Sequence, residues 1–447
     1  PIYVNNWGTN PNGTGSHPSS LSSPGLVFRI TRNITLDSLF IVNGLGSSLI
    51  IGDQTPVPAP TVNFNSSILP GIDTIYQSSD GNQTVLNFNT TNVPAINQLV
   101  DIFTEVHYRA NTGTTTVGTS KIYDKIFVQN GADVVFTGTP SVTTSFTVDL
   151  GSSATVGTLS TRWLSVADGG TVTINGKITT PKLIGLVSSS VGTPASTSGA
   201  IQFIGAGDIV LGPNSTVEYS GISITGTQYI TPRTDYVNMI ISGTGVSKTW
   251  STGTSLSGSF TMNTTGATGL ILTTPLTLNG TVNLISGKIN TDATNILTLG
   301  ASAVLTGGNN NSYVSGPVKR NTASTSTAIL PVGKGGWYRP VSIKPSAVTA
   351  SVYQAEFFNS TYTNTTVTSP LLSVDTTYWN VSKISGANAS VGLSLDSVNS
   401  VPNATTAHEL VVANFNGSSW VNVSATPVNP GTATSGTAVS DRKSTRL

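Results

Sequence analysis

The chain has 447 residues, of which only 9% are charged and 37% are hydrophobic, and its formal net charge is +1. This charged fraction lies far below the roughly 25% of an ordinary soluble domain, and the chain carries no basic stripe of the kind that binds nucleic acids. Zero cysteines exclude disulfides and thiolate metal sites. No apolar run approaches the ~18 residues that a membrane-spanning helix needs.

The residue types and their pattern predict an all-β protein. Thr, Val and Ile, which fit a pleated and half-buried surface, are abundant. The 46 glycines and 23 prolines separate short segments in which apolar and polar residues alternate. No convincing amphipathic helix is found. Disorder is the rival interpretation, but it does not account for the patterned apolar residues.

Residues 1–25 are predicted to form a short strand and a linker. Ile2, Tyr3 and Val4 are good strand formers, and the Asn-, Gly-, Ser- and Pro-rich segment behind them is typical of a flexible tether. Such a strand could add to an open sheet edge of a neighbouring copy. The alternative is that it pairs within its own chain or frays. Ile2, Tyr3 and Val4 are therefore the candidate assembly strand.

Residues 26–120 are expected to be a β-rich N-terminal region, and residues 121–308 a β-helix-like region. In the second region short strands recur at fairly even intervals, and the phrase TVTINGKI at 171–178 is echoed by TVNLISGKI at 281–289. Weak self-similarity between short strands predicts a parallel β-helix, in which each rung covers its neighbour. Hairpins in a string of sandwiches would give similar local signals, so that alternative stays open.

After a junction at residues 309–336 the rhythm changes. Residues 337–440 contain longer segments of strand-forming residues, spaced as in an immunoglobulin-like β-sandwich. They lie at residues 338–343, 352–358, 376–382, 390–395, 409–415 and 419–424. The expected fold is thus all-β, with a parallel β-helix or solenoid followed by a C-terminal immunoglobulin-like sandwich.

Residues 441–447, DRKSTRL, differ from everything before them. They hold three of the 20 basic residues and one of the 19 acidic residues, so the net charge changes from +1 to −1 without them. The string resembles the translation of a common sequencing adapter. We expect it to be an artefact at the end of a truncated gene; a natural basic tail is the alternative.

Several phrases resemble the repeats of large secreted surface proteins of Bacteroidota. They are YVNMIISGTGVSKTW at 236–250, LNGTVNLISGKI at 278–289, YVSGPVKR at 313–320 and LPVGKGGWYRP at 330–340. In that family the last two join a β-helix to an immunoglobulin-like module. The resemblance covers roughly residues 230–440 and implies an extracellular or cell-surface protein, often cargo of type IX secretion. The family carries no catalytic motif that could be transferred to this chain.

Few residues indicate catalysis or metal binding. His17, His107 and His408 show no metal-ligand spacing and are expected on the surface or in loops. The carboxylate pairs Asp73/Asp80, Asp124/Asp133 and Glu409 with Asp396 are scattered, whereas glycoside hydrolysis needs two that converge. Asp168–Gly169 is predicted to be a turn, although Lys177 and Lys182 near it could imitate a lyase site. No cofactor and no metal are expected.

Five of the six tryptophans are mostly flanked by strand formers, so core packing is the expected role, and sugar stacking by one or two of them is the alternative. They are Trp163, Trp250, Trp337, Trp379 and Trp420.

Two patterns suggest covalent glycans as partners of the chain. The Asn-x-Ser/Thr pattern gives the candidates Asn65, Asn82, Asn364 and Asn403. The resemblance to Bacteroidota proteins implies a different O-linked pattern, Asp followed by Ser or Thr. Its candidates are Ser38, Thr74, Thr376 and Ser397.

The expected function is that of a non-enzymatic extracellular structural protein. It would be a subunit of a bacterial surface filament or layer whose main partner is another copy of itself, and open-ended head-to-tail addition would generate the filament. The first alternative is a cell-surface adhesin that binds glycans. The second is a β-helix polysaccharide-degrading enzyme, which requires acidic residues clustered on one rung face.

Overall fold

The structure is a computed structural model. It describes residues 20–21, 27–30, 33–36, 40–42, 48–51, 59–65, 68–69, 71–75, 83–99, 103–118, 120–157, 162–187, 199–222, 226–245, 247–251, 254–265, 269–374, 376–396, 411–423 and 435–439.

The chain forms a parallel β-solenoid of about 10 turns, with no helix among the described residues. The chain divides into two compact units, unit 1 with Pro1–Gly221 and Ile230–Val237, and unit 2 with Ile222–Tyr229 and Asn238–Leu447. Parallel pairing confirms the predicted β-helix over the alternative of stacked sandwiches. It also extends to both sides of the predicted segment 121–308.

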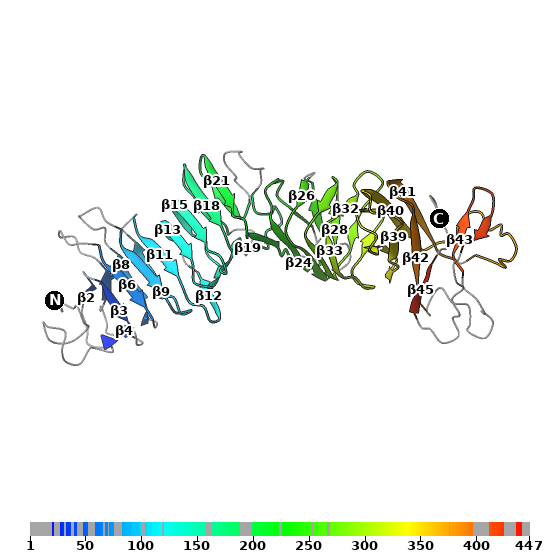
Figure 1. Cartoon of the computed structure of the whole chain (residues 1–447). Helices are drawn as coiled ribbons and strands as arrows, with labels where there is room; N and C mark the ends of the chain where they lie inside the picture. Colours follow the sequence, from blue (N-terminus) through cyan, green and yellow to red (C-terminus); the bar gives the residue numbers. More distant parts are fainter. Residues whose placement is uncertain are drawn as a thin grey trace. The chain divides into compact units, whose positions relative to one another are not determined.

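Unit 1 contains four sheets whose strands pair in parallel, each with a neighbour one rung away (Figure 1). Sheet 1A contains β1 (Ser20–Leu21), β4 (Phe40–Val42) and β7 (Ile68–Leu69). Sheet 1B contains β2 (Val27–Ile30), β5 (Ser48–Ile51), β8 (Gly71–Ile75) and β10 (Ala95–Leu99). Sheet 1C contains β3 (Ile34–Leu36), β6 (Thr61–Phe64), β9 (Val85–Phe88), β11 (Glu105–Tyr108), β13 (Ile122–Val128), β15 (Ser141–Val148), β17 (Leu164–Val166), β18 (Gly170–Ile174), β20 (Ile201–Phe203) and β21 (Gly207–Leu211). Sheet 1D contains β12 (Thr114–Val117), β14 (Asp133–Phe136), β16 (Ser153–Thr155), β19 (Lys177–Thr180) and β22 (Thr216–Tyr219).

The core of unit 1 follows from the period-two alternation along its strands. Apolar residues at every second position of sheet 1C point inward, and aromatic rings from successive rungs contact one another. The centroids of Phe64 and Phe88 are 5.0 Å apart and those of Phe88 and Tyr108 5.6 Å, and Tyr108 also contacts Phe136, on β14 of sheet 1D, at 5.7 Å. The other positions of the same strands form the opposite face of the sheet.

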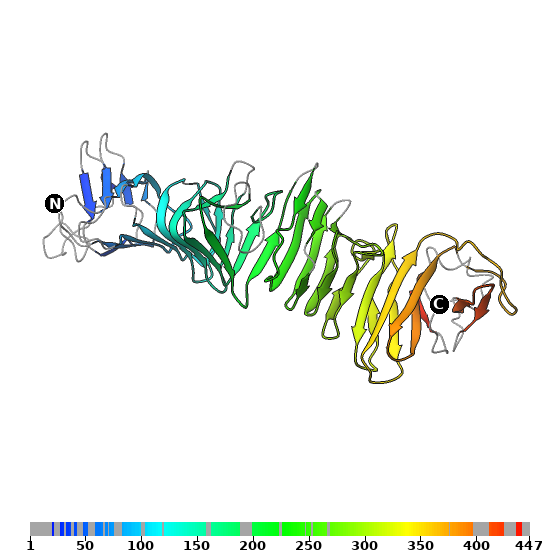
Figure 2. The ribbon, with the colours of Figure 1, turned by 90° about the horizontal axis from the view of Figure 1, so that it is seen from above.

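Unit 2 contains three sets of strands paired in parallel, coloured green to yellow-green in Figure 2. Sheet 2A contains β24 (Asn238–Thr244), β27 (Phe260–Thr265), β30 (Thr281–Ser286) and β33 (Val304–Gly307). Sheet 2B contains β23 (Thr227–Tyr229), β25 (Ser247–Trp250), β28 (Leu270–Leu272), β31 (Ile289–Asn290) and β34 (Val314–Ser315). The parallel part of sheet 2C contains β26 (Thr254–Leu256), β29 (Leu276–Leu278), β32 (Leu297–Leu299) and β35 (Val318–Thr322).

Antiparallel pairing begins at β35, where β40 (Ser351–Phe358) and then β41 (Tyr378–Ser385) complete sheet 2C. Sheet 2D is antiparallel throughout and contains β36 (Ala328–Leu330), β39 (Val341–Pro345), β42 (Ala389–Asp396) and β45 (Ser435–Val439). Two short hairpins join β37 (Gly333–Lys334) to β38 (Trp337–Tyr338), and β43 (Ala413–Phe415) to β44 (Trp420–Asn422). Strands therefore lie at or within all six segments predicted after residue 337.

The two echoing phrases share one local pattern, each at a corner between two sheets. Residues 171–178 cover most of β18, a corner at Gly176 and the start of β19, and residues 281–289 cover β30, a corner at Gly287 and the start of β31. Each phrase is thus one strand, one glycine corner and the next strand.

Candidate functional site

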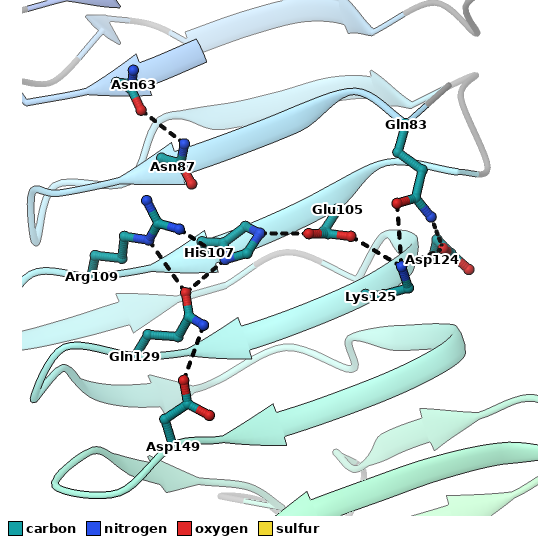
Figure 3. A network of polar contacts seen from close by, with 10 residues as sticks. All are labelled: Asn63, Gln83, Asn87, Glu105, His107, Arg109, Asp124, Lys125, Gln129 and Asp149. Atoms are coloured by element: carbon teal, nitrogen blue, oxygen red, sulfur yellow. Dashed lines mark hydrogen bonds and ion pairs between the residues drawn. The ribbon is translucent and has the colours of Figure 1, made fainter. Parts of the chain in front are cut away.

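A network of charged and neutral polar side chains lies on sheet 1C (Figure 3). Its side chains come from strands β6, β9, β11, β13 and β15 or from residues next to them, mostly from the face opposite the core. They are Asn63, Gln83, Asn87, Glu105, His107, Arg109, Asp124, Lys125, Gln129 and Asp149.

Glu105 lies at the centre of the network. One carboxylate oxygen is 2.7 Å from Nε2 of His107 on the same strand, and the other is 3.2 Å from Nζ of Lys125 on the next rung. The side chain of Glu105 is 16% exposed and that of Lys125 28% exposed. Partial burial strengthens the ion pair relative to one in bulk water.

His107 joins Glu105 to the rung beyond. Its Nδ1 is 2.7 Å from Oε1 of Gln129, which also accepts a hydrogen bond from Arg109 Nε at 3.3 Å. Gln129 in turn donates from Nε2 to Asp149 at 3.0 Å, so its amide orientation is defined on both sides. Nδ1 is also 3.3 Å from Nη2 of Arg109, a group that can only donate, so this nitrogen lies between an acceptor and a donor.

The expectation that all three histidines lie on the surface or in loops is wrong for His107. It lies within β11 and is only 7% exposed. Its ring stacks on Phe127 with centroids 4.6 Å apart and planes 11° apart. His107 lies in a strand because its neighbours Val106 and Tyr108 are strand-forming residues whose side chains are buried. His17 and His408 lie outside the described residues.

Asp124 closes the other end of the network. It is 6% exposed and accepts hydrogen bonds from Gln83, Thr143 and Thr144, the Thr143 contact being 2.9 Å. Gln83 also accepts a hydrogen bond from Lys125 at 3.2 Å. The structure does not pair Asp124 with Asp133, which lies in sheet 1D and accepts hydrogen bonds from Thr114 and Ser153.

Asparagines extend the polar face toward earlier rungs. Asn87 donates to Asn63 at 2.8 Å, and Asn89 donates to Asn65 at 2.7 Å. Asn63 donates in turn to Thr35 at 3.2 Å. Identical side chains stacked at equivalent positions of successive rungs thus form hydrogen-bonded ladders.

The glycosylation candidates have different surroundings. Asn65 and Thr376 are exposed, whereas Asn364 is half-buried and hydrogen-bonds the carbonyl of Ser418 at 3.2 Å. Thr74 is 3% exposed and donates to Asp73, which does not favour its modification. All of these sites stay predictions. Candidates outside the described residues are Ser38, Asn82, Ser397 and Asn403, together with the assembly strand Ile2, Tyr3 and Val4.

The lysines considered for a lyase site have structural partners. Lys177 pairs with Glu218 at 3.1 Å. Lys182 donates to the carbonyl of Arg162 at 3.1 Å, and its ammonium lies 5.3 Å from the ring centroid of Trp163. Asp168 lies in the turn predicted at 168–169, and its side chain accepts a hydrogen bond from the backbone amide of Ala206.

The tryptophans divide into two groups. Trp250 and Trp420 are buried, as expected for core residues. Trp163, Trp337 and Trp379 are half-buried. The expectation of core packing therefore applies fully to two of the five.

Sequence reasoning missed the network as a unit. A detectable signal existed, because Glu105, His107 and Arg109 alternate along one strand, and Lys125 and Gln129 recur about one rung later. In a chain with 9% charged residues, such alternation of polar side chains is informative. Within the described ranges, no group of three or more His, Cys, Asp or Glu could hold a metal ion. No helix there has the length and hydropathy that crossing a bilayer requires.

Comparison of the chain with protein-family models, with curated proteins and with solved structures gave no match.

Proposed function

We propose that the chain is an extracellular structural protein, a subunit of a bacterial surface filament or layer, rather than an enzyme. The observation that carries the proposal is the pairing of polar side chains between successive rungs. Glu105 with Lys125, His107 with Gln129, and Gln129 with Asp149 each connect one rung to the next. These side chains stabilise the stacking of the solenoid.

Three carboxylates do lie in one network, as the polysaccharide-degrading alternative requires. Each of them, however, is engaged by donors of the protein itself: Glu105 by His107 and Lys125, and Asp149 by Gln129. Asp124 is buried and accepts three hydrogen bonds. A substrate would have to displace these donors, so the geometry favours a structural role for the carboxylates.

The surface location belongs to the same proposal. Its support is the low charge, the high Ser, Thr and Asn content, and the resemblance of residues 230–440 to secreted Bacteroidota proteins. The immunoglobulin-like sandwich predicted for residues 337–440 is also part of it. The antiparallel pairing of β40 with β41 and of β39 with β42 is the kind of pairing such a module needs.

Electron microscopy and sedimentation velocity of the purified chain test the proposal. A structural subunit is expected to form filaments or layers as its concentration rises. A chain that stays monomeric at every concentration would contradict the proposal. Release of reducing sugars from a polysaccharide, lost in Glu105→Gln, would instead favour the enzyme.

A cluster of aromatic rings in unit 2 favours the adhesin as a second candidate. Tyr362 contacts Tyr378, Phe415 and Trp420 with centroids 5.0 to 5.4 Å apart, and all but Trp420 are half-buried. The apolar faces of sugar rings pack on such side chains. Saturable binding on a glycan array that is reduced in Tyr362→Ala would support the adhesin.

A further inference from the structure

Strand β41 forms one edge of sheet 2C. It pairs antiparallel with β40 over Phe358↔Tyr378 to Val352↔Ser385, and Figure 1 shows the two strands side by side. Among the described residues no strand pairs with its other edge. A strand of eight residues with one free edge presents a row of backbone donors and acceptors to another extended segment.

One end of this edge carries the features that normally prevent edge-to-edge pairing. The register with β40 shifts between Val352 and Tyr353, which face Ser385 and Lys383. The Lys383 ammonium adds a charge there and donates to Asn388 at 2.7 Å. A bulge and a lysine therefore protect the end at residues 383–385.

The remaining stretch, residues 378–382, carries neither protection. It contains no proline, no charged residue and no register shift. Tyr378 stacks on Phe358 across the strand pair, with centroids 4.6 Å apart and planes 3° apart. Trp379, on the opposite face, contacts Phe357 at 5.2 Å and donates its indole N–H to the carbonyl of Arg339 at 3.0 Å.

These contacts hold an aromatic side chain in place on each face of the free edge. Trp379 is half-buried and leaves part of its ring for a further neighbour, whereas Tyr378, also half-buried, is already contacted by Tyr362 with centroids 5.1 Å apart. Cross-strand pairs between aromatic and β-branched residues are favourable. The edge therefore suits an uncharged, extended segment with alternating β-branched and aromatic side chains.

We propose that residues 378–382 of β41 accept an extended segment from a second copy of this chain, and that the segment is Ile2–Tyr3–Val4. This assignment rests on the proposed function and identifies the acceptor in the assembly contact. The segment is uncharged and has the required residue types. Residues 5–24, which follow it, are rich in Asn, Gly, Ser and Pro. A flexible linker of roughly 20 residues spans about 25 Å on average, which allows pairing between copies.

The test uses the full chain, a chain lacking residues 1–10, and a synthetic peptide of residues 1–10. The deletion leaves β1 in place, because Ser20 and Leu21 pair with β4. We expect the full chain to assemble and the shortened chain to remain monomeric and bind the peptide. In the complex, alternate amides of residues 378–382 should gain protection from hydrogen exchange.

Two lysine variants of the shortened chain locate the contact. Asn380→Lys places a charge in the middle of the free edge at an exposed position, and it should weaken peptide binding by roughly tenfold or more. Ser385→Lys places the same charge on the same strand at the already protected end, and it should leave binding unchanged. Melting temperatures like that of the parent chain show that both variants are folded.

The outcomes separate the two proposals. If the full chain assembles but residues 378–382 gain no protection, or if Asn380→Lys binds the peptide as tightly as Ser385→Lys, β41 is not the acceptor and the structural function stands. A full chain that never assembles overturns the structural function itself. Peptide binding to β41 without assembly would show that the edge is a receptor for the segment within one chain.

Discussion

Lys125 makes more contacts than any other cation of the polar network. Its ammonium is 3.2 Å from Glu105 and 3.2 Å from Gln83, and 3.9 Å from Asp124. Removing one partner from a partly buried pair costs more than removing one from an exposed pair, because the remaining charge is left in a poorly solvated place.

We therefore expect Lys125→Met to lower the free energy of unfolding of unit 1 by about 1–3 kcal/mol. Lys177→Met is the matched control, since Lys177 pairs with one carboxylate and its side chain is 40% exposed. Lys177→Met should lower the free energy of unfolding by less than about 1 kcal/mol, because solvent screens such a partly exposed pair. Urea unfolding of both variants measures the difference, and equal losses would show that the network adds nothing to the single pair.

Lys248 is a fully buried lysine of unit 2. It lies on β25, where its register partners are Gln228 and Leu270. Burial lowers its pKa from 10.5 to about 8. Between these values the unfolded chain keeps a proton that the folded chain has lost. The free energy of unfolding should therefore rise with pH across this window and fall as the pH drops toward 8.

The pH dependence can be measured by comparing the unmodified chain with Lys248→Met. Between pH 7.5 and 9.5 the unmodified chain should gain stability relative to the variant. This range stays below the ordinary tyrosine pKa of about 10. Above that pH, the unfolded chain loses a proton that buried Tyr108 keeps, because burial raises the pKa of Tyr108. Tyr108 therefore makes the free energy of unfolding fall as the pH rises. Parallel stability curves for the two proteins would contradict the assignment.

The corners between strands restrict the residue types that a rung can use. Gly269, just before β28, has a φ of +62°, and a Cβ there would lie 2.0 Å from the carbonyl oxygen of Lys288 on the next rung. Gly336, between β37 and β38, has a φ of +89°, but a Cβ there would meet nothing within 4 Å. An L-residue would be strained at either position because φ is positive, but only at Gly269 would its Cβ also collide with a backbone atom.

Gly269→Ala should accordingly destabilise unit 2 by about 2–4 kcal/mol, whereas Gly336→Ala should cost about 1 kcal/mol. Thermal unfolding of the two variants compares them directly. If both variants lost similar stability, the backbone of Lys288 would be able to move away from the added Cβ with little energetic cost.

Unit 1 is stabilised by contacts between neighbouring rungs, as in other repeat architectures. The inward rings of Phe64, Phe88 and Tyr108 illustrate this, since each contacts the ring of the adjacent rung. A change in one rung should consequently affect the rungs on either side of it more than distant ones.

Phe88→Ala tests this expectation. It removes a ring that is 1% exposed and should cost about 3–5 kcal/mol. Hydrogen exchange should accelerate in β6 and β11, and the amides of β28 to β32 in unit 2 should be unaffected. Val85→Ala, on the opposite and half-buried face of the same strand, is the control and should change little. Equal acceleration throughout both units would show that the solenoid unfolds as one cooperative body.

The fold class could be predicted from local signals. The alternation in segments such as 171–174 and 281–286 places every second side chain in the core, and the glycine after each marks the corner. These features depend only on neighbouring residues. The sequence therefore predicted an all-β chain and a parallel β-helix, and the structure confirms both.

The alternation of Glu105, His107 and Arg109 marks a polar strand face in the sequence, but the partners of these side chains depend on the register between rungs. Glu105 meets Lys125 one rung and 20 residues later, and Gln83 meets Asp124 two rungs and 41 residues later. Such spacings follow from the lengths of the corners and loops around each turn, which no local pattern encodes. Composition and periodicity thus determine which residues form strands and which face the core. Only the packed rungs decide which polar side chains become neighbours, because stacking brings together residues that are far apart along the chain.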